Sequence, residues 1–422
     1  MRRVVSILAA ARARPLGRGS WLMMGGAFAA FALAVGVMQS YTVYLIVFIQ
    51  AFGWSRAEAS IPYSLSQLVM GASAPLVGAL VDRLGPRRLI VLGGGLMALG
   101  LFATAAARAL WHVILSYGLV TTLGANCLGL VVFVPLLSRR FVRQRGMAIA
   151  IVQSANGIGR AASMPAAAFA IALVGWRASY LVQGALMAAL ALPLAAFFRG
   201  AERPLPPPPA AEATAAPETA AAPGWTLGEA ARTPHFWLLF AVYLFTGLGS
   251  YIVSLHQLAF AVSEGFNKLY AAEVLGAGAF LSTFGIILTG TSSDYLGREV
   301  SAILAYGVSI AGVICALFIT GPQQTWLLWL HACLFGLTWG ARGPAITAKT
   351  ADLFPGPRLG TILGVITLGS GLGAAGGSWA AGFIFDLFGS YHLAFLLSIA
   401  FYACGMAAFW ALRRPPARRA RQ

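Results

Sequence analysis

Two arginines lie in stretches of sequence that are otherwise apolar. Arg342 belongs to "TWGARGPAITAKTADLF" at 338–354, and Arg160 follows "QSANGIG". A guanidinium group carries a permanent charge, and its planar fork of donors matches a carboxylate in two parallel hydrogen bonds. At 1.5 Å per helical residue, Arg342 lies about 15 Å from the polar end of its segment. Such residues predict an anion-binding site, with two structural alternatives: each arginine caps a neighbouring helix or holds a gate closed.

The acidic residues favour an anion over a cation. All of them lie in loops or at the ends of predicted helices: Glu58, Asp82, Glu202, Glu212, Glu218, Glu229, Glu264, Glu273, Asp294, Glu299, Asp352 and Asp386. Because buried charges need partners, a cavity with arginine and no carboxylate attracts anions and repels cations. Lys349 lies two turns after Arg342, near enough to the polar end that its amine reaches water.

Five further polar residues within the apolar stretches are candidates to orient a bound anion. They are His256, Tyr41, Tyr44, Asn126 and Gln153. Tyrosine and asparagine also join helices in membranes by hydrogen bonds, so packing is the alternative interpretation. His256 can hydrogen-bond or titrate near neutral pH, and a satisfied packing histidine is the alternative.

The composition places these residues in a membrane. The 422 residues are 59% hydrophobic and 10% charged, too apolar for a single soluble core. Runs of roughly 20 or more mainly apolar residues predict twelve membrane-spanning helices in an all-α fold. The predicted spans are 21–50, 61–81, 88–107, 112–137, 146–174, 177–198, 236–262, 271–293, 299–320, 325–351, 359–386 and 391–412.

Basic residues predict the orientation in the membrane. With both termini in the cytoplasm, 22 of the 29 lysines and arginines fall on the cytoplasmic side, four on the other side and three within spans. This asymmetry is the positive-inside rule, so we expect a multi-pass protein of the cell's inner (plasma) membrane. The net charge of +17 therefore indicates no nucleic-acid partner.

The chain divides into two halves with tails. We expect cytoplasmic tails at 1–20 and 413–422, six-helix bundles at 21–198 and 236–412, and a flexible Pro/Ala-rich cytoplasmic linker at 199–235. The halves repeat each other at an offset of 212 residues: "GALVDRLGPRR" at 78–88 corresponds to "GTSSDYLGREV" at 290–300, and "LGANCLGL" at 123–130 to "FGLTWGAR" at 335–342. Two parallel repeats around a polar midplane cavity predict a transporter that works by alternating access.

The first of these motifs resembles a family signature. "GALVDRLGPRRL" is similar to the loop that follows the second helix in the major facilitator superfamily. The resemblance implies that five charged residues near this loop and its repeat control opening on the cytoplasmic side: Asp82, Arg83, Arg87, Asp294 and Arg298. Charges that only enforce membrane topology are the alternative.

Further stretches resemble one branch of that superfamily over nearly the whole chain. "QAFGWSRAEAS", "RRFVRQRGMAIAIVQSANGIG", "GWTLGEAARTPHFWLL" and "GFIFDLFGSYHLAF" are similar to the bacterial monocarboxylate transporters and oxalate:formate antiporters. The resemblance implies carboxylate transport. Where those carriers place a lysine in helix 1 and an arginine in helix 8, this chain has Ile46 and Ile286, so Arg342 and Arg160 are its candidate anion ligands.

The sequence therefore predicts a secondary active transporter of a small mono- or dicarboxylate. A proton or a counter-anion as coupling partner is left open. Two other classes remain as alternatives: a proton-coupled exporter of drugs on the same fold, and a non-transporting sensor. We predict no enzyme, cofactor or metal site, because no nucleophile–base pair is visible and the four cysteines have no ligand spacing.

Overall fold

The computed structural model describes residues 18–141, 145–198, 225–355 and 359–413, and these are almost entirely helical. In the first half the helices are α2 (Arg18–Phe52), α3 (Arg56–Leu84), α4 (Pro86–Ala105), α5 (Leu110–Val113), the π-helix η1 (Ile114–Thr121), α6 (Thr122–Cys127), α7 (Leu130–Arg140) and α8 (Arg145–Ala196). In the second half they are α10 (Leu227–Ala231), α11 (Pro234–Ser263), α12 (Lys268–Tyr295), α13 (Arg298–Leu317), α14 (Thr325–Thr338), α15 (Arg342–Leu353), α16 (Leu359–Phe388) and α17 (His392–Ala411).

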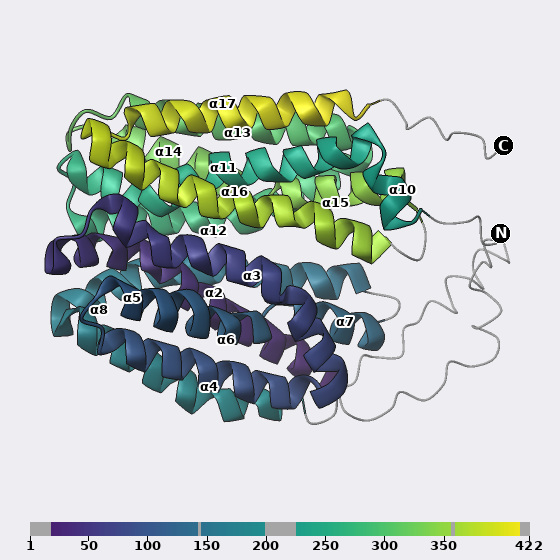
Figure 1. The fold of residues 1–422 in the computed structure, drawn as a ribbon, viewed down its shortest axis with the longest axis horizontal. Coiled ribbons are helices and arrows are strands. Elements are labelled where there is room, and N and C mark those ends of the chain that lie inside the picture. Colours follow the sequence, from purple (N-terminus) through teal and green to yellow (C-terminus); the bar gives the residue numbers. More distant parts are fainter. Residues whose placement is uncertain (1–17, 142–144, 199–224, 356–358, 414–422) are drawn as a thin grey trace, which may run out of the picture.

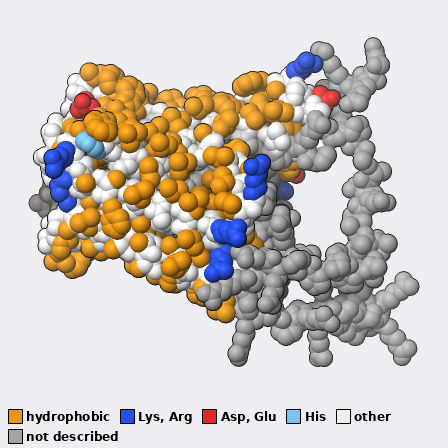
Figure 2. Space-filling view, turned by 60° about the horizontal axis from the view of Figure 1, so that its bottom comes forward, with side chains coloured by type: hydrophobic (Ala, Val, Ile, Leu, Met, Phe, Trp, Pro, Cys, Tyr) orange, Lys and Arg blue, Asp and Glu red, His pale blue; other side chains and the backbone are white. Residues whose placement is uncertain are grey.

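The helices have the length and surface of membrane spans. Among the described residues, ten segments are long and apolar enough to cross a bilayer. One of them, Ile151–Ala196, contains two predicted spans, because Gly175 interrupts α8 with a φ of 78°. The predicted tenth span is split into α14 and α15, each too short to count alone. If Ile151–Ala196 is counted as two spans and α14 with α15 as one more, the ten segments become the twelve predicted spans. Figure 2 shows hydrophobic side chains over the middle of the molecule and Lys and Arg toward its two ends.

Two spans predicted as continuous are broken at matching places in the repeat. The fourth predicted span (112–137, called helix 4 below) is interrupted between α6 and α7 at Leu128 and Gly129. The tenth (325–351, called helix 10) is interrupted between α14 and α15 at 339–341. The two breaks are separated by the repeat offset of 212 residues. Gly340 has a φ of 72°, a conformation that glycine adopts without steric strain. Neither break was predicted, because both spans are apolar along most of their length.

The two halves pack as bundles that lie side by side (Figure 1). They meet mainly where α3 contacts α16 and α8 contacts α12, with a smaller contact between α2 and α11. The start of α2, the end of α17 and the short helix α10 lie at one end of the molecule, which we call the α10 end. The opposite end, where α3 begins at Arg56, is called the Arg56 end.

The last part of the predicted linker belongs to the second bundle. Residues 225–235, predicted as flexible linker, contain α10 and the start of α11. Thr226 and Glu229 form a reciprocal N-terminal cap on α10, and Ala230 is buried in a cluster with Phe236 and Phe354. The sequence "WTLGEAA" carries this capping pattern, which the Pro/Ala-rich composition around it obscured. The rest of the linker and most of both tails lie outside the described residues.

Glycines allow the helices to approach closely. On α12, a Cβ atom added at Gly285 would lie 1.6 Å from the carbonyl oxygen of Leu337, and one at Gly278 would lie 2.2 Å from that of Ala332. The backbones of α12 and α14 are therefore in direct contact, as small residues permit in membrane proteins.

We predict that Gly285→Ala lowers the melting temperature of the purified protein, because the added methyl group forces α12 away from α14, at a cost of about 1–3 kcal/mol. Gly95→Ala on α4 is the matched control, since nothing lies within 4 Å of its added Cβ. Its stability should be unchanged or slightly raised, because alanine favours helix over glycine. Equal melting temperatures for the two variants would contradict the direct backbone contact.

Candidate functional site

Arg160 projects from α8 toward the other half of the molecule. Its side chain is 2% exposed, and its guanidinium carbon lies 4.0 Å from the centre of the Trp339 ring, in the break of helix 10. Between the described residues it forms no ion pair, and its Nε and Nη1 atoms have no hydrogen-bond partner. The face of Trp339 offsets part of the charge, but Nε and Nη1 have no acceptor. A buried cation without acceptors is costly in free energy, and an anion bound beside it would lower that cost.

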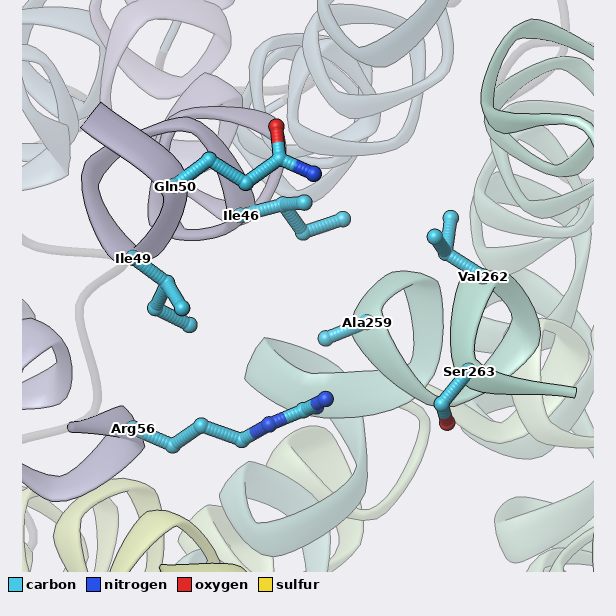
Figure 3. Close-up of a pocket in the computed structure, with 7 residues that line it drawn as sticks. All are labelled: Ile46, Ile49, Gln50, Arg56, Ala259, Val262 and Ser263. Carbon is cyan, nitrogen blue, oxygen red and sulfur yellow. The ribbon is translucent and has the colours of Figure 1, made fainter. Parts of the chain in front are cut away.

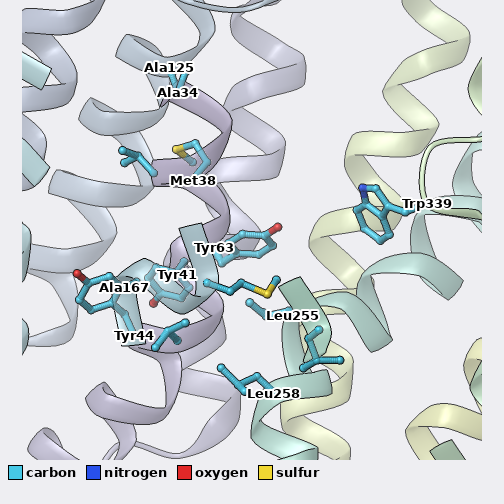
Figure 4. Close-up of a cluster of buried hydrophobic side chains, with 14 of the residues drawn as sticks. Ala34, Met38, Tyr41, Tyr44, Tyr63, Ala125, Ala167, Leu255, Leu258 and Trp339 are labelled. Carbon is cyan, nitrogen blue, oxygen red and sulfur yellow. The ribbon is translucent and has the colours of Figure 1, made fainter. Parts of the chain in front are cut away.

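Aromatic side chains from both halves surround this arginine. The Tyr251 ring of α11 lies 5.1 Å from the Trp339 ring and 6.3 Å from the Tyr63 ring of α3, measured between centroids. Tyr251 and, through it, Tyr63 are therefore in contact with the Trp339 ring that Arg160 approaches. Figure 4 shows Tyr63 and Trp339 approaching from opposite halves, near Leu255 of α11. We call Arg160, Trp339, Tyr63 and Tyr251 the central cluster.

Arg342 occupies a different environment, inside the second half. Its Nη1 donates to the Ser309 hydroxyl at 2.6 Å and to the Ala305 carbonyl at 3.3 Å, and its Nη2 donates to the Ser250 hydroxyl at 3.2 Å. The guanidinium carbon also lies 4.9 Å from the Tyr306 ring centre and 4.8 Å from that of Tyr402. All of these partners belong to α11, α13 and α17, so Arg342 joins the start of α15 to its own bundle. This geometry favours the structural alternative for Arg342.

Three of the other candidates pack inside the first half. The Tyr41 hydroxyl donates to the Ala59 carbonyl at 2.7 Å, and the Tyr44 hydroxyl bonds Ser179 at 2.6 Å. Asn126 donates to the Met70 carbonyl and the Ser73 hydroxyl, both at 2.9 Å, directly before the break in helix 4. These contacts correspond to the packing interpretation of all three.

The last two candidates lie at the boundary between the halves or near it. His256 is fully buried, and its ring nitrogens contact Ser60, Ser378 and Tyr391 toward the Arg56 end. Gln153 is half-buried on α8, seven residues before Arg160 and therefore on the same helix face. Gln153 stays a predicted substrate contact, whereas His256 has its hydrogen-bonding groups occupied by protein.

The predicted gating charges have few described contacts. The side chains of Asp82 and Asp294 lie outside the described residues. Arg83 is exposed and Arg87 is half-buried. Arg298 forms an ion pair of 3.0 Å with Asp352, within its own half. Lys349, predicted to reach water, instead pairs with Glu299 at 2.6 Å and fixes α15 to α13.

The structure is closed at the Arg56 end. Contacts between the halves extend from the bond of Thr283 to the Ser154 carbonyl, through the central cluster, to that end of α3. A separate cavity of about 130 Å³ opens at the Arg56 end, lined by Ile46, Ile49, Gln50, Arg56, Ala259, Val262 and Ser263 (Figure 3).

Sequence reasoning missed the aromatic partners of Arg160. Trp339 stands in the same "TWGAR" segment as Arg342, and a tryptophan followed by glycine in an apolar helix was the available signal. Tyr63 and Tyr251 gave none, because tyrosines occur throughout the chain and only the packed helices place these two opposite each other.

Comparison with known proteins agrees with this architecture. The sequence profile of the Major Facilitator Superfamily matches residues 22–348, so the chain belongs to this superfamily of membrane transporters. It is similar to monocarboxylate transporter 13 of Rattus norvegicus, with 29% identity over 93% of this chain and 88% of the relative. It is also similar to the oxalate:formate antiporter of Oxalobacter formigenes, with 24% identity over 79% of this chain and 77% of that protein.

The fold also matches a solved structure. A bacterial homologue of the human lysosomal transporter Spinster superposes with a TM-score of 0.71, covering 95% of this chain and all of the other, at 18% identity. At this identity the likeness concerns the fold. The predicted superfamily and its branch of relatives are therefore confirmed, and the chain is a multi-pass membrane transporter.

The two buried arginines should respond differently to a neutral replacement of similar volume. We predict that Arg342→Met lowers the melting temperature, because α15 loses the charged hydrogen bonds that join it to Ser309, Ser250 and the Ala305 carbonyl, at about 1.5–3 kcal/mol for a hydrogen bond to a charged group. Arg160→Met should leave the melting temperature unchanged or raise it, since methionine in place of a buried charge without partners is neutral or stabilising. Thermal unfolding in detergent measures both, and the reverse order would exchange the roles of the two arginines.

Proposed function

We propose that the protein is a secondary active transporter that moves a small organic monoanion, a monocarboxylate, across the cell membrane by alternating access. The observation that carries this proposal is Arg160, a buried guanidinium at the boundary of the two halves with unsatisfied donors and no acidic partner among the described residues. The names of the similar carriers, which transport monocarboxylates or exchange oxalate and formate, agree with a carboxylate substrate.

The surroundings of Arg160 define how such a substrate would bind. Its carboxylate accepts hydrogen bonds from the guanidinium fork, in the two-bond geometry that arginine offers. Its apolar part lies against Trp339, Tyr63 and Tyr251, whose rings come from both halves. A ligand held in this way contacts both bundles at once, and binding is thereby linked to their relative movement.

A single guanidinium favours one negative charge. A preference for dianions would require that Arg160 and Arg342 both reach the substrate, and Arg342 already donates to groups of its own bundle. The second carboxylate of a dianion would therefore lose its hydration without gaining a cation.

We infer that a substrate reaches Arg160 from the side of the α10 end, because the described bonds between the halves extend from Ser154 to the Arg56 end. We assign the α10 end to the cytoplasm, where the positive-inside rule places the basic loops. In this assignment the described conformation is closed on the outer side of the membrane, with Arg160 buried between the halves. Opening at the Arg56 end would expose the same arginine to the other side of the membrane.

We predict that Arg160→Met weakens monocarboxylate binding by about 2–5 kcal/mol, because the substrate anion loses the charged partner that this arginine supplies. Arg160→Lys should recover part of the affinity, since it keeps the charge but loses the fork. Arg108→Gln is the control, because Arg108 is exposed in the loop before α5. The measurement is equilibrium binding of butyrate and succinate, two acids with four carbons, to each purified variant.

The acid pair separates the two valences. Wild type should bind butyrate at least as tightly as succinate. Full butyrate affinity in a folded Arg160→Met protein would contradict the site. Loss of affinity in Arg342→Met at unchanged stability would return the anion-binding role to Arg342.

A further inference from the structure

The two halves are joined at the Arg56 end by an acid that caps a helix of the opposite half. Helix α3 begins at Arg56, and its first backbone N–H groups have no acceptor within the helix. Asp386 of α16 accepts from the Arg56 N–H at 2.8 Å and from the Ala57 N–H at 2.7 Å. A carboxylate at this position also interacts favourably with the positive end of the helix dipole.

A second set of bonds extends from the Arg56 side chain. Its guanidinium carbon lies 3.5 Å from the centre of the Phe385 ring, and Nη1 donates to the Tyr391 hydroxyl. That hydroxyl lies 3.1 Å from Nδ1 of His256, and Nε2 of His256 lies 2.9 Å from the Ser378 carbonyl. Since a carbonyl only accepts, we assign the ring proton to Nε2, and Tyr391 then donates to Nδ1.

The backbones also touch at this point. A Cβ atom added at Gly382 of α16 would lie 2.6 Å from the Arg56 carbonyl oxygen and 2.8 Å from the Ala57 nitrogen. Glycine at 382 therefore allows α16 to approach the start of α3 closely enough for Asp386, one turn further along, to reach both N–H groups.

We propose that Arg56, Asp386, Tyr391 and His256 form a latch that holds the Arg56 end shut and must break before this end opens. Asp386 is its principal residue, because it alone satisfies two backbone donors of the opposite half. The proposal rests on the alternating access proposed above, and it does not depend on the charge of the substrate. It also assigns His256 to the latch and not to the substrate.

The test measures opening at the Arg56 end directly. Ser64 lies on α3 one turn after Ser60, which contacts His256, and it is 8% exposed. In a protein whose four cysteines are replaced by alanine, Ser64→Cys reports opening to a membrane-impermeant thiol reagent applied to proteoliposomes. Ser263→Cys, exposed at the same end, identifies the vesicles in which that end faces the reagent.

We expect Asp386→Asn to accelerate the labelling of the Ser64→Cys protein by about tenfold or more, because an amide accepts less strongly than a carboxylate and turns a donor toward the backbone N–H groups. Tyr391→Phe, which removes one hydroxyl, should give a smaller increase. Glu264→Gln is the control, an acid at the same end whose removal should leave labelling unchanged. All rates are measured without substrate, so a failure of the anion site would not affect them.

Labelling rates of Asp386→Asn and Tyr391→Phe equal to that of Glu264→Gln would overturn the proposal. Should Asp386→Asn fold poorly, Gly382→Ala provides the second variant, since its methyl group separates the same two helices. It should accelerate labelling as well, and an unchanged rate in a folded Gly382→Ala protein would count equally against the latch.

Discussion

Within a bilayer core, every polar group must find its partners inside the protein, because no water is available to hydrogen-bond it. Most interior polar groups of this chain obey that constraint. Arg342, Asn126 and His256 each satisfy backbone or side-chain groups of neighbouring helices. Arg160 departs from it further than Arg342 does: both Nε and Nη1 of Arg160 lack a hydrogen-bond partner, whereas Arg342 lacks one at Nε alone. The difference is informative because an unsatisfied buried charge is costly, and a bound anion would lower that cost.

The two repeats stabilise an equivalent break in a membrane span with different residues. Both break a span at the same repeat position, and both place a polar side chain beside the break. In helix 4, Asn126 bonds to α3 through the Met70 carbonyl, while in helix 10 Arg342 bonds to α11 and α13. An irregular backbone inside a membrane needs such partners. The break in helix 10 also places Trp339 against Arg160. Arg342 supports this break, and it thereby helps to position the aromatic partner of Arg160.

The two ends of the molecule use charge differently. At the α10 end, the described ion pairs Arg298–Asp352 and Lys349–Glu299 join α15 to α13 within one half. At the Arg56 end, Asp386 reaches across to the first residues of the other half. In the proposed alternating access, charges within a bundle keep it rigid, whereas charges between bundles separate when that end opens. The loop signature led us to expect gating charges at the α10 end, on Asp82, Asp294 and the neighbouring arginines. Their role stays a prediction for a conformation that is closed at that end.

The sequence by itself determined that the chain spans a membrane, how many times, and that it is built from two repeats, because these properties depend on the length and spacing of apolar runs. It also identified both buried arginines. It could not determine which of them faces the other half, because helices that are apolar on all sides carry no pattern that fixes their rotation. The pairing of Asp386 with α3 joins residues 330 positions apart, and no local signal announces it. Only the packed bundles decided that Arg342 faces its own half while Arg160 meets Trp339 across the boundary.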